Sequence, residues 1–360
     1  MSDRRYTLWF NRIEAISNMV RVKLLDEFES AEAIYRADRS ALRRTAILKY
    51  SEIEAIESAR EQDIDHMWED LKEMGISFVS IEDKEYPGLL RNIYDKPYGL
   101  YYIGTLPPDG RKMTAIVGAR QCSSYGYSTA HEIGYLMAKT GCGIISGMAR
   151  GIDSAAQKGA LTGNGYTCAI LGCGVDVCYP PENRELYQEI KKRGCILSEF
   201  APGCPPDSKH FPRRNRLISG ISESVIVVEA RVRSGSLITA QMALQQNREV
   251  YAVPGRINDP MSEGTNRLIE QGAQIIPSTE RLLEKMTEDS GLVLHLDKQR
   301  QPSLNKKEKT VYAAIDYYAK SAEAIMNEVQ ISYRDLLEVI YSLTEAGLIK
   351  ETFRNNYVRI

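Results

Sequence analysis

Residues 113–120, Met-Thr-Ala-Ile-Val-Gly-Ala-Arg, and residues 143–153, Gly-Ile-Ile-Ser-Gly-Met-Ala-Arg-Gly-Ile-Asp, decide the fold, because each joins a short apolar run to a glycine-rich turn. Apolar residues at successive positions are typical of a strand that is buried on both faces. Similar runs follow, mostly separated by about 10–15 residues of helical periodicity. This alternation predicts an α/β domain with right-handed crossovers and an open, doubly wound, mostly parallel sheet of about seven strands. The further runs are Thr167–Leu171, Cys195–Ser198, Val225–Glu229, Glu249–Val253 and Gln274–Ile276.

The sequence changes character on both sides of this region. The first segment has helical periodicity with little Gly or Pro, which predicts a small bundle of short helices. Two strand-like runs, 76–81 and 100–103, precede the alternating region. The last segment predicts three helices and a hairpin, with Ser332 as an N-cap, and this is a winged-helix pattern. The expected division is residues 1–72 (helical), 73–287 (α/β), 288–306 (linker) and 307–360 (winged-helix-like).

Composition excludes several classes of protein. The 360 residues hold 46 Lys plus Arg and 48 Asp plus Glu, a formal charge of −2, so a polyanion site must be a local patch. We find no run of 18 apolar residues and no signal-peptide core, which predicts a cytoplasmic protein without a membrane segment. The seven cysteines are odd in number and include no Cys-x-x-Cys pair, so we expect free thiols in a reducing compartment and no metal site.

Glycine follows several predicted strands, next to Arg or Ser. The first turn contains Gly118 and Arg120, the second Ser146 and Gly147, and a later one Gly235 and Ser236. Glycine lets the backbone approach an anion, which helix-start N–H groups and an adjacent arginine can then bind. Ligands of doubly wound sheets lie at the carboxyl ends of the strands, so these turns predict one cleft for phosphates, although tight turns without a ligand remain the ordinary explanation of any single one.

Known catalytic and cofactor motifs are missing from the sequence. The glycine spacings fit neither a dinucleotide fingerprint nor a P-loop, and no nucleophile elbow is present. We therefore expect no cofactor and no enzymatic activity. Asp153 and Asp176 are interpreted as helix caps, and Glu199 and Glu229 as carboxylates that position arginines.

A basic segment stands out in this nearly neutral chain. It runs Lys209-His-Phe-Pro-Arg-Arg-Asn-Arg216 and contains no acidic residue. Cations that follow a phosphate backbone, with a ring that stacks on a base, are typical of single-stranded nucleic-acid binding. Four phosphate contacts would give a log–log salt slope of about −3. The alternative is a solvated loop with Phe211 in the core and the arginines paired to carboxylates; His210 is expected to be structural.

Several strings in the sequence resemble the DprA/Smf family of DNA-processing proteins. They include Ile116–Arg120, Tyr179–Asn183, Leu197–Glu199, His210–Arg216 and Val253–Gly255, together with Ser146–Ala156 and Glu229–Ala240, and they run in order between about residues 75 and 287. The resemblance implies an extended Rossmann-like central domain, an N-terminal SAM or helix-hairpin-helix-like domain and a C-terminal winged-helix-like domain.

The resemblance also implies a function and a set of site residues. It implies binding of single-stranded DNA, protection of incoming DNA during natural transformation, loading of the recombinase RecA, and a homodimer without enzymatic activity. The dimer would form around Leu268, Ile269 and Ile275. The implied DNA contacts are Gly118, Arg120, Ser146, Gly147, Arg184, Lys209, Phe211, Arg213, Arg214, Asn215, Arg216, Gly235 and Ser236.

The chain departs from the family pattern at a few positions. Ala119 stands where Ser is frequent, and Pro181 stands where Lys is frequent, with Arg184 as the nearest cation. Residues 15–18, Ala-Ile-Ser-Asn, replace the expected glycine hairpin of the N-terminal domain.

Two other functions compete with DNA binding by the central domain. A nucleoside monophosphate phosphoribohydrolase would use a loop such as residues 234–239, but Gln241 stands where its glutamate is expected. A transcription factor would read duplex DNA with the last helix, but Arg334 there is accompanied by Asp335 and Glu338.

Overall fold

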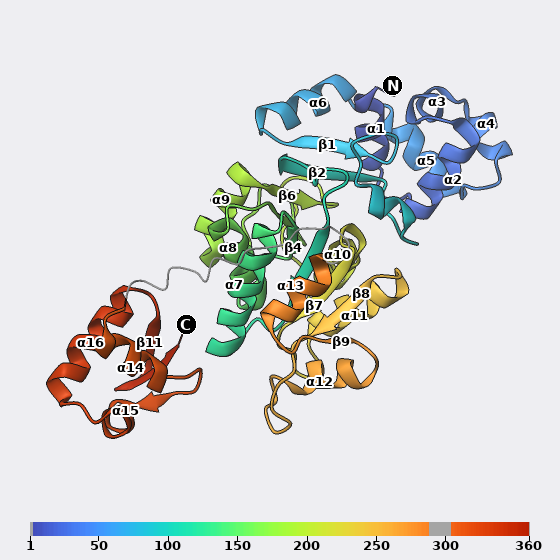
Figure 1. The fold of residues 1–360 in the computed structure, drawn as a ribbon. Helices are drawn as coiled ribbons and strands as arrows, with labels where there is room; N and C mark the ends of the chain where they lie inside the picture. Colours follow the sequence, from blue (N-terminus) through green and yellow to red (C-terminus); the bar gives the residue numbers. More distant parts are fainter. Residues whose placement is uncertain (1–2, 288–303, 360) are drawn as a thin grey trace.

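A computed structural model describes residues 3–287 and 304–359 (Figure 1). Its centre is a nine-stranded sheet in the order β1-β2-β6-β5-β4-β3-β7-β8-β9. All neighbours from β6 to β9 are parallel, which confirms the mostly parallel α/β sheet. The strands are β1 (Ser77–Ser80), β2 (Gly99–Gly104), β3 (Met113–Val117), β4 (Gly143–Ser146), β5 (Thr167–Ile170), β6 (Cys195–Ser198), β7 (Ser224–Val227), β8 (Glu249–Ala252) and β9 (Gln274–Ile275).

The strand order reverses between β3 and β7. The chain moves outward from β3 to β6 and then returns to start again at β7, beside β3. One face of the sheet packs against α7, α8 and α13, and the other against α10 and α11. The helices of this domain are α7 (Ser124–Lys139), α8 (Ile152–Thr162), α9 (Arg184–Arg193), α10 (His210–Ile221), α11 (Gly235–Gln245), α12 (Glu263–Glu270) and α13 (Thr279–Thr287), with short 3₁₀ turns at Gly88–Asn92 and Pro181–Asn183.

The N-terminal helices extend the central domain and share its core. Trp9 lies at their centre, and its indole N–H donates to the Ala59 carbonyl at 2.9 Å. The same core continues into Phe78 of β1 and Tyr101 of β2, the two antiparallel strands that continue the sheet beyond β6. The helices are α1 (Arg4–Asn11), α2 (Asn18–Phe28), α3 (Ala31–Arg36), α4 (Arg39–Arg44), α5 (Tyr50–Ala59) and α6 (Ile64–Glu73).

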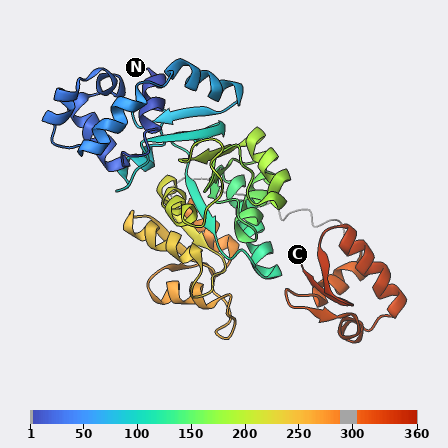
Figure 2. The ribbon, with the colours of Figure 1, turned by 180° about the vertical axis from the view of Figure 1, so that it is seen from behind.

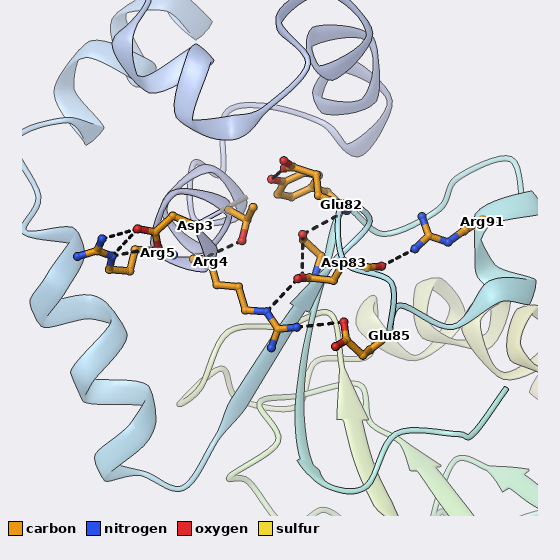
Figure 3. A network of polar contacts seen from close by, with 10 residues as sticks. Asp3, Arg4, Arg5, Glu82, Asp83, Glu85 and Arg91 are labelled. Carbon is orange, nitrogen blue, oxygen red and sulfur yellow. Dashed lines mark hydrogen bonds and ion pairs between the residues drawn. The ribbon is translucent and has the colours of Figure 1, made fainter. Parts of the chain in front are cut away.

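Ion pairs reinforce this junction (Figure 3). The Arg4 guanidinium on α1 contacts the Asp83 carboxylate at 2.9 Å and the Glu85 carboxylate at 3.1 Å. The Asp83 carboxylate in turn accepts the backbone N–H of Ser80 at 2.8 Å. A shared apolar core and a bonded turn fix the position of the N-terminal helices against the sheet.

The C-terminal unit consists of three helices and a three-stranded sheet in the order β10-β12-β11 (Figure 2). Leu304 is buried in its core and Asn305 caps its first helix, so residues 304–306 belong to this unit and not to the expected linker. The remainder of that expected linker, 288–303, lies outside the described residues. The elements are α14 (Lys306–Ala314), β10 (Lys320–Ser321), α15 (Ala322–Val329), α16 (Tyr333–Glu345), β11 (Ile349–Phe353) and β12 (Asn356–Arg359).

The C-terminal unit touches the central domain through two tyrosines. The Tyr317 ring meets the Tyr125 ring on α7 edge to face, with centroids 5.4 Å apart. The Arg256 guanidinium lies 3.7 Å from the centroid of the Tyr318 ring. Throughout the described residues, we find no helix with the length and apolar character needed to cross a membrane.

Candidate nucleic-acid interface

The glycine turns meet at the carboxyl edge of the sheet because β5, β4, β3 and β7 are neighbours. Backbone hydrogen bonds tie the turns together: the Ala119 N–H donates to the Glu229 carbonyl at 2.8 Å, and the Ile152 N–H donates to the Ala119 carbonyl at 3.2 Å. The turns after β3, β4 and β7 therefore form one connected surface at the reversal of strand order, where doubly wound sheets bind their ligands.

Arg120 and Phe211 come together on this surface. The exposed Arg120 guanidinium lies 5.1 Å from the centroid of the half-buried Phe211 ring. The Tyr179 ring also stacks on Phe211, with centroids 5.6 Å apart and an interplanar angle of 30°. A small pocket adjoins these rings, with Gly147 and Gly172 in its wall. A cation, two rings and glycine backbone thus share one site, which suits a phosphate and a base.

Arg214 forms the buried wall of this pocket. Its side chain is only 4% exposed, and its Nη1 donates to the Ile170 carbonyl at 2.6 Å. Burial lowers the pKa of Arg214 to about 10, and the nearby Asp153 carboxylate opposes that shift. Burial likewise raises the pKa of Asp153. The pair is an internal charge couple beneath the glycine turn.

Asp153 holds that turn directly, because its carboxylate accepts the Gly147 N–H at 3.0 Å. Gly151 occupies the N-cap position of α8, so the interpretation of Asp153 as a cap is wrong. Asp176 is not a cap either: its carboxylate accepts the Gly203 N–H at 2.9 Å and joins two loops. The short polar side chains in these turns therefore fix loop positions.

The other arginines of α10 pair with Glu199. The Arg216 side chain is buried, and its Nη2 lies 2.6 Å from the Glu199 Oε2 and its Nε 3.1 Å from the Asp95 Oδ2. Arg213 is exposed, and its Nε lies 3.1 Å from the Glu199 Oε1. The expectation that Glu199 positions arginines is confirmed. The expectation of a solvent-facing cationic segment fits Lys209 and Arg213 but is wrong for Arg214 and Arg216, which are inside.

Several other residues predicted to contact DNA form hydrogen bonds with groups of the protein itself. The buried Ser146 hydroxyl donates to the Ile116 carbonyl at 2.6 Å. The Ser236 hydroxyl lies 2.7 Å from the Ser234 hydroxyl. The Asn215 amide donates to the Gly235 carbonyl at 3.4 Å, which joins α10 to the first residue of α11. Of the cations predicted for the site, Arg120, Arg184, Lys209 and Arg213 are exposed. Arg150, which was not predicted, is also exposed and lines the pocket.

The role predicted for Glu229 is wrong, and the Tyr179 ring had no predicted role. Within residues 3–287 and 304–359, Glu229 has no ion pair with an arginine; it accepts the N–H and hydroxyl of Ser123, the N-cap of α7. Tyr179 was noted only as part of a sequence string shared with the family. Its position in a loop after a predicted strand was a signal for a second ring that could stack on a base.

The residues expected at a dimer interface lie at the far edge of the sheet. Ile275 is on β9, the edge strand, and its side chain is 53% exposed. Ile269 is partly buried, and Leu268 is buried in the core. The interface stays a prediction.

The doubly wound sheet, with a cation and rings at the reversal point, defines a Rossmann-type domain, a class whose ligand sites lie at the carboxyl edge of the sheet. Residues 77–287 match the family described as DNA recombination-mediator protein A. The chain is 42% identical over 219 residues to the DNA processing protein DprA of Bacillus subtilis, covering 60% of this chain and 73% of the relative. It is also 42% identical over 204 residues to DprA of Streptococcus pneumoniae, covering 57% and 72%. The chain belongs to this family.

Solved structures agree with this assignment. The X-ray structure of DprA from Streptococcus pneumoniae superposes with a TM-score of 0.70 at 34% identity, over 79% of this chain and 99% of that one. A structure of DprA from Helicobacter pylori, which describes a single-stranded DNA binding mode, gives 0.54 at 32% identity, over 59% and 97%.

Proposed function

We propose that this protein binds single-stranded DNA at the carboxyl edge of its sheet and acts as a recombination mediator. The observation that carries the proposal is the exposed Arg120 guanidinium against the Phe211 ring, beside the glycine turns. Arg120 and Lys209 would contact phosphates, and Phe211 and Tyr179 would stack on bases. Family membership and the DNA-binding mode described for the Helicobacter relative support this choice.

Exposed and buried residues have different roles in this proposal. Arg214, Asp153 and Arg216 would hold the turns and α10 in place, because their charged groups already bind a backbone carbonyl, a backbone N–H and the Glu199 carboxylate inside the protein. Backbone at Gly118, Gly147 and Gly235 would approach the phosphates. A contact to backbone and ring faces carries little sequence information, so binding should tolerate any base.

A binding assay with oligothymidylate tests the DNA site. Arg120→Ala should weaken binding about 30-fold, or ~2 kcal/mol, because it removes one charged contact and one support of the ring. The salt slope should become shallower by about 0.7 for one lost phosphate contact. Arg281→Ala, an exposed arginine on α13, is the matched control. Unchanged binding by Arg120→Ala would refute the assigned site.

The wider role extends this proposal. We infer that the protein protects incoming DNA during transformation and loads RecA on it in the cytoplasm, as a homodimer and without enzymatic activity. The dimer would use the exposed edge at Ile275, so Ile275→Glu should yield monomers in sedimentation. RecA loading is tested by RecA filament formation on strands coated with single-strand binding protein. The proposed absence of enzymatic activity is tested separately, and release of free base from nucleoside monophosphates would contradict it.

The flanking units fit the same role as accessory domains. The element order α14, β10, α15, α16, β11, β12 supports a winged-helix assignment for the C-terminal unit, and the six short N-terminal helices support a SAM or helix-hairpin-helix-like domain. Arg334 on α16 lies 3.5 Å from Glu338, so this helix has an acidic neighbour beside its cation. We infer that α16 binds a protein partner and does not read a major groove.

A further inference from the structure

A large cleft separates the N-terminal helices from the carboxyl edge of the sheet. Its volume is about 930 Å³, near the upper end of the range for pockets that hold organic ligands. The loop between α1 and α2, residues 12–17, and the start of α2 form one wall. Phe200, His210 and Arg213 form the opposite wall. The shared core described above fixes the two walls relative to each other.

Helix α10 borders this cleft and the DNA pocket at the same time. Phe211 and Arg214 line the pocket that contains Arg120, whereas His210 and Arg213 line the cleft. Consecutive residues at the start of one helix therefore face two cavities. A strand that stacks on Phe211 needs only to pass over the first turn of α10 to enter the cleft.

The charges in the cleft favour an anion. Arg21 from α2 and Arg213 from α10 face the cavity from opposite walls, and the positive charge of Arg213 lowers the pKa of Arg21, after the larger effect of burial. The Arg21 guanidinium donates to the carbonyls of Phe10, Asn11 and Ile13 and to the Asn18 side chain, so its hydrogen bonds bring it no opposite charge. Two like charges across a cavity repel, and an anion between them offsets that repulsion by attracting both.

The lining of the cleft is formally neutral, with three arginines and three carboxylates, and the adjoining Arg216 brings the excess of one positive charge. Glu199 pairs with Arg213 and Arg216, and Asp95 pairs with Arg216. Glu14 is the remaining acidic residue in the described lining, and it stands beside the exposed Arg12. Arg12 adds a further cation near the Tyr101 hydroxyl.

Flat rings in the cleft offer a surface for a base. The His210 ring stacks on the Phe200 ring with centroids 4.1 Å apart and an interplanar angle of 25°. The Arg213 guanidinium lies 5.7 Å from the Phe200 centroid. A ring pair edged by a guanidinium repeats the arrangement of Arg120, Phe211 and Tyr179 in the pocket.

We propose that the single strand continues from the Phe211 pocket over the start of α10 into this cleft, where its phosphates face Arg12, Arg21 and Arg213. The inference rests on the proposed DNA-binding function and assigns the N-terminal domain a direct share of the site. It predicts that a long strand makes contacts that a short one does not.

The test compares oligothymidylates of six and twenty nucleotides by fluorescence anisotropy. Arg12→Ala should weaken binding of the 20-mer about three- to tenfold and make its salt slope shallower by about 0.7, and should leave the 6-mer unchanged. Arg12 is exposed, so the variant should fold. Arg44→Ala, an exposed arginine on α4, is the matched control. Equal binding of the 20-mer by Arg12→Ala and the parent would overturn the proposal, and so would an equal loss for both lengths.

Photocross-linking gives an independent measurement on the unaltered chain. A 20-mer with 5-iododeoxyuridine near one end should cross-link to peptides from residues 11–21, and the absence of any cross-link within residues 1–73 would overturn the proposal. Failure of the proposed function looks different, because Arg120→Ala would then leave both oligonucleotides bound as tightly as by the parent.

Discussion

Replacing Arg216 with alanine should destabilise the fold and should not primarily remove a DNA contact. The Arg216 guanidinium is 2.6 Å from the Glu199 carboxylate, and both side chains are almost fully buried, at 8% and 3% exposed. Removing one partner of a buried ion pair leaves an uncompensated charge and costs about 3–5 kcal/mol. Arg213 stays 3.1 Å from the same carboxylate, so the loss should be near the lower end, about 3 kcal/mol.

Urea denaturation of Arg216→Ala and Arg213→Ala measures this difference. Arg213 is 54% exposed, so its variant should lose only about 0–1 kcal/mol. In a Glu199→Gln background, which removes the buried charge, Arg216→Ala should cost less than in the parent. If Arg216→Ala unfolds at the parent's urea midpoint and instead fails to bind oligothymidylate, Arg216 is a phosphate ligand and the reasoning about its burial is wrong.

Two further predictions concern the loops and the thiols. Gly147→Ala would place a Cβ 1.9 Å from the Arg214 Nη1, which is held by its bond to the Ile170 carbonyl. The variant should lose about 1–3 kcal/mol of unfolding free energy, measured by urea denaturation. Gly235→Ala is the control, because its Cβ would meet no atom within 4 Å. A Gly147→Ala variant as stable as the control would mean that Arg214 moves freely. Burial raises the pKa of Cys142 to about 11, so iodoacetamide at pH 8 should leave this thiol unmodified until urea is added. Mass spectrometry measures the modification. Alkylation of Cys142 in the folded protein at the rate of a free thiol would contradict its burial.

The sequence was sufficient for the parallel part of the sheet. Apolar runs such as 113–117 mark strands that are buried on both faces, and the glycine turns after them had to meet at one edge because the strands are parallel. The antiparallel extension by β1 and β2 was not predicted, because periodicity indicates a strand but not its neighbour. The cleft of the N-terminal domain arises from that extension, so it was missed as well.

The spacing of apolar residues around Arg214 indicates that this residue is buried, although its charge suggests an exposed position. Phe211, Arg214, Leu217, Ile218 and Ile221 follow the spacing of one helical face, and the structure buries four of them fully and the ring of Phe211 in part. An arginine on the apolar face of a helix should be expected to be buried with that face. The burial of Arg216 had no comparable signal, because its partner Glu199 is distant in sequence and is brought near only by the end of β6.

The buried arginines can increase affinity for DNA without touching it. Asp153 holds the turn that contains Gly147, and Arg214 joins α10 to the end of β5 through the Ile170 carbonyl. Arg216 and Glu199 hold the start of α10, which carries Lys209 and Phe211. A loop that is already fixed loses little conformational freedom when a strand binds, so more of the contact energy appears as affinity. Arg213 shares the Glu199 carboxylate and is preorganised in the same way, although its guanidinium faces solvent. The single segment of four cations therefore divides by helical face: Lys209 and Arg213 are available to phosphates, while Arg214 and Arg216 keep the binding surface rigid.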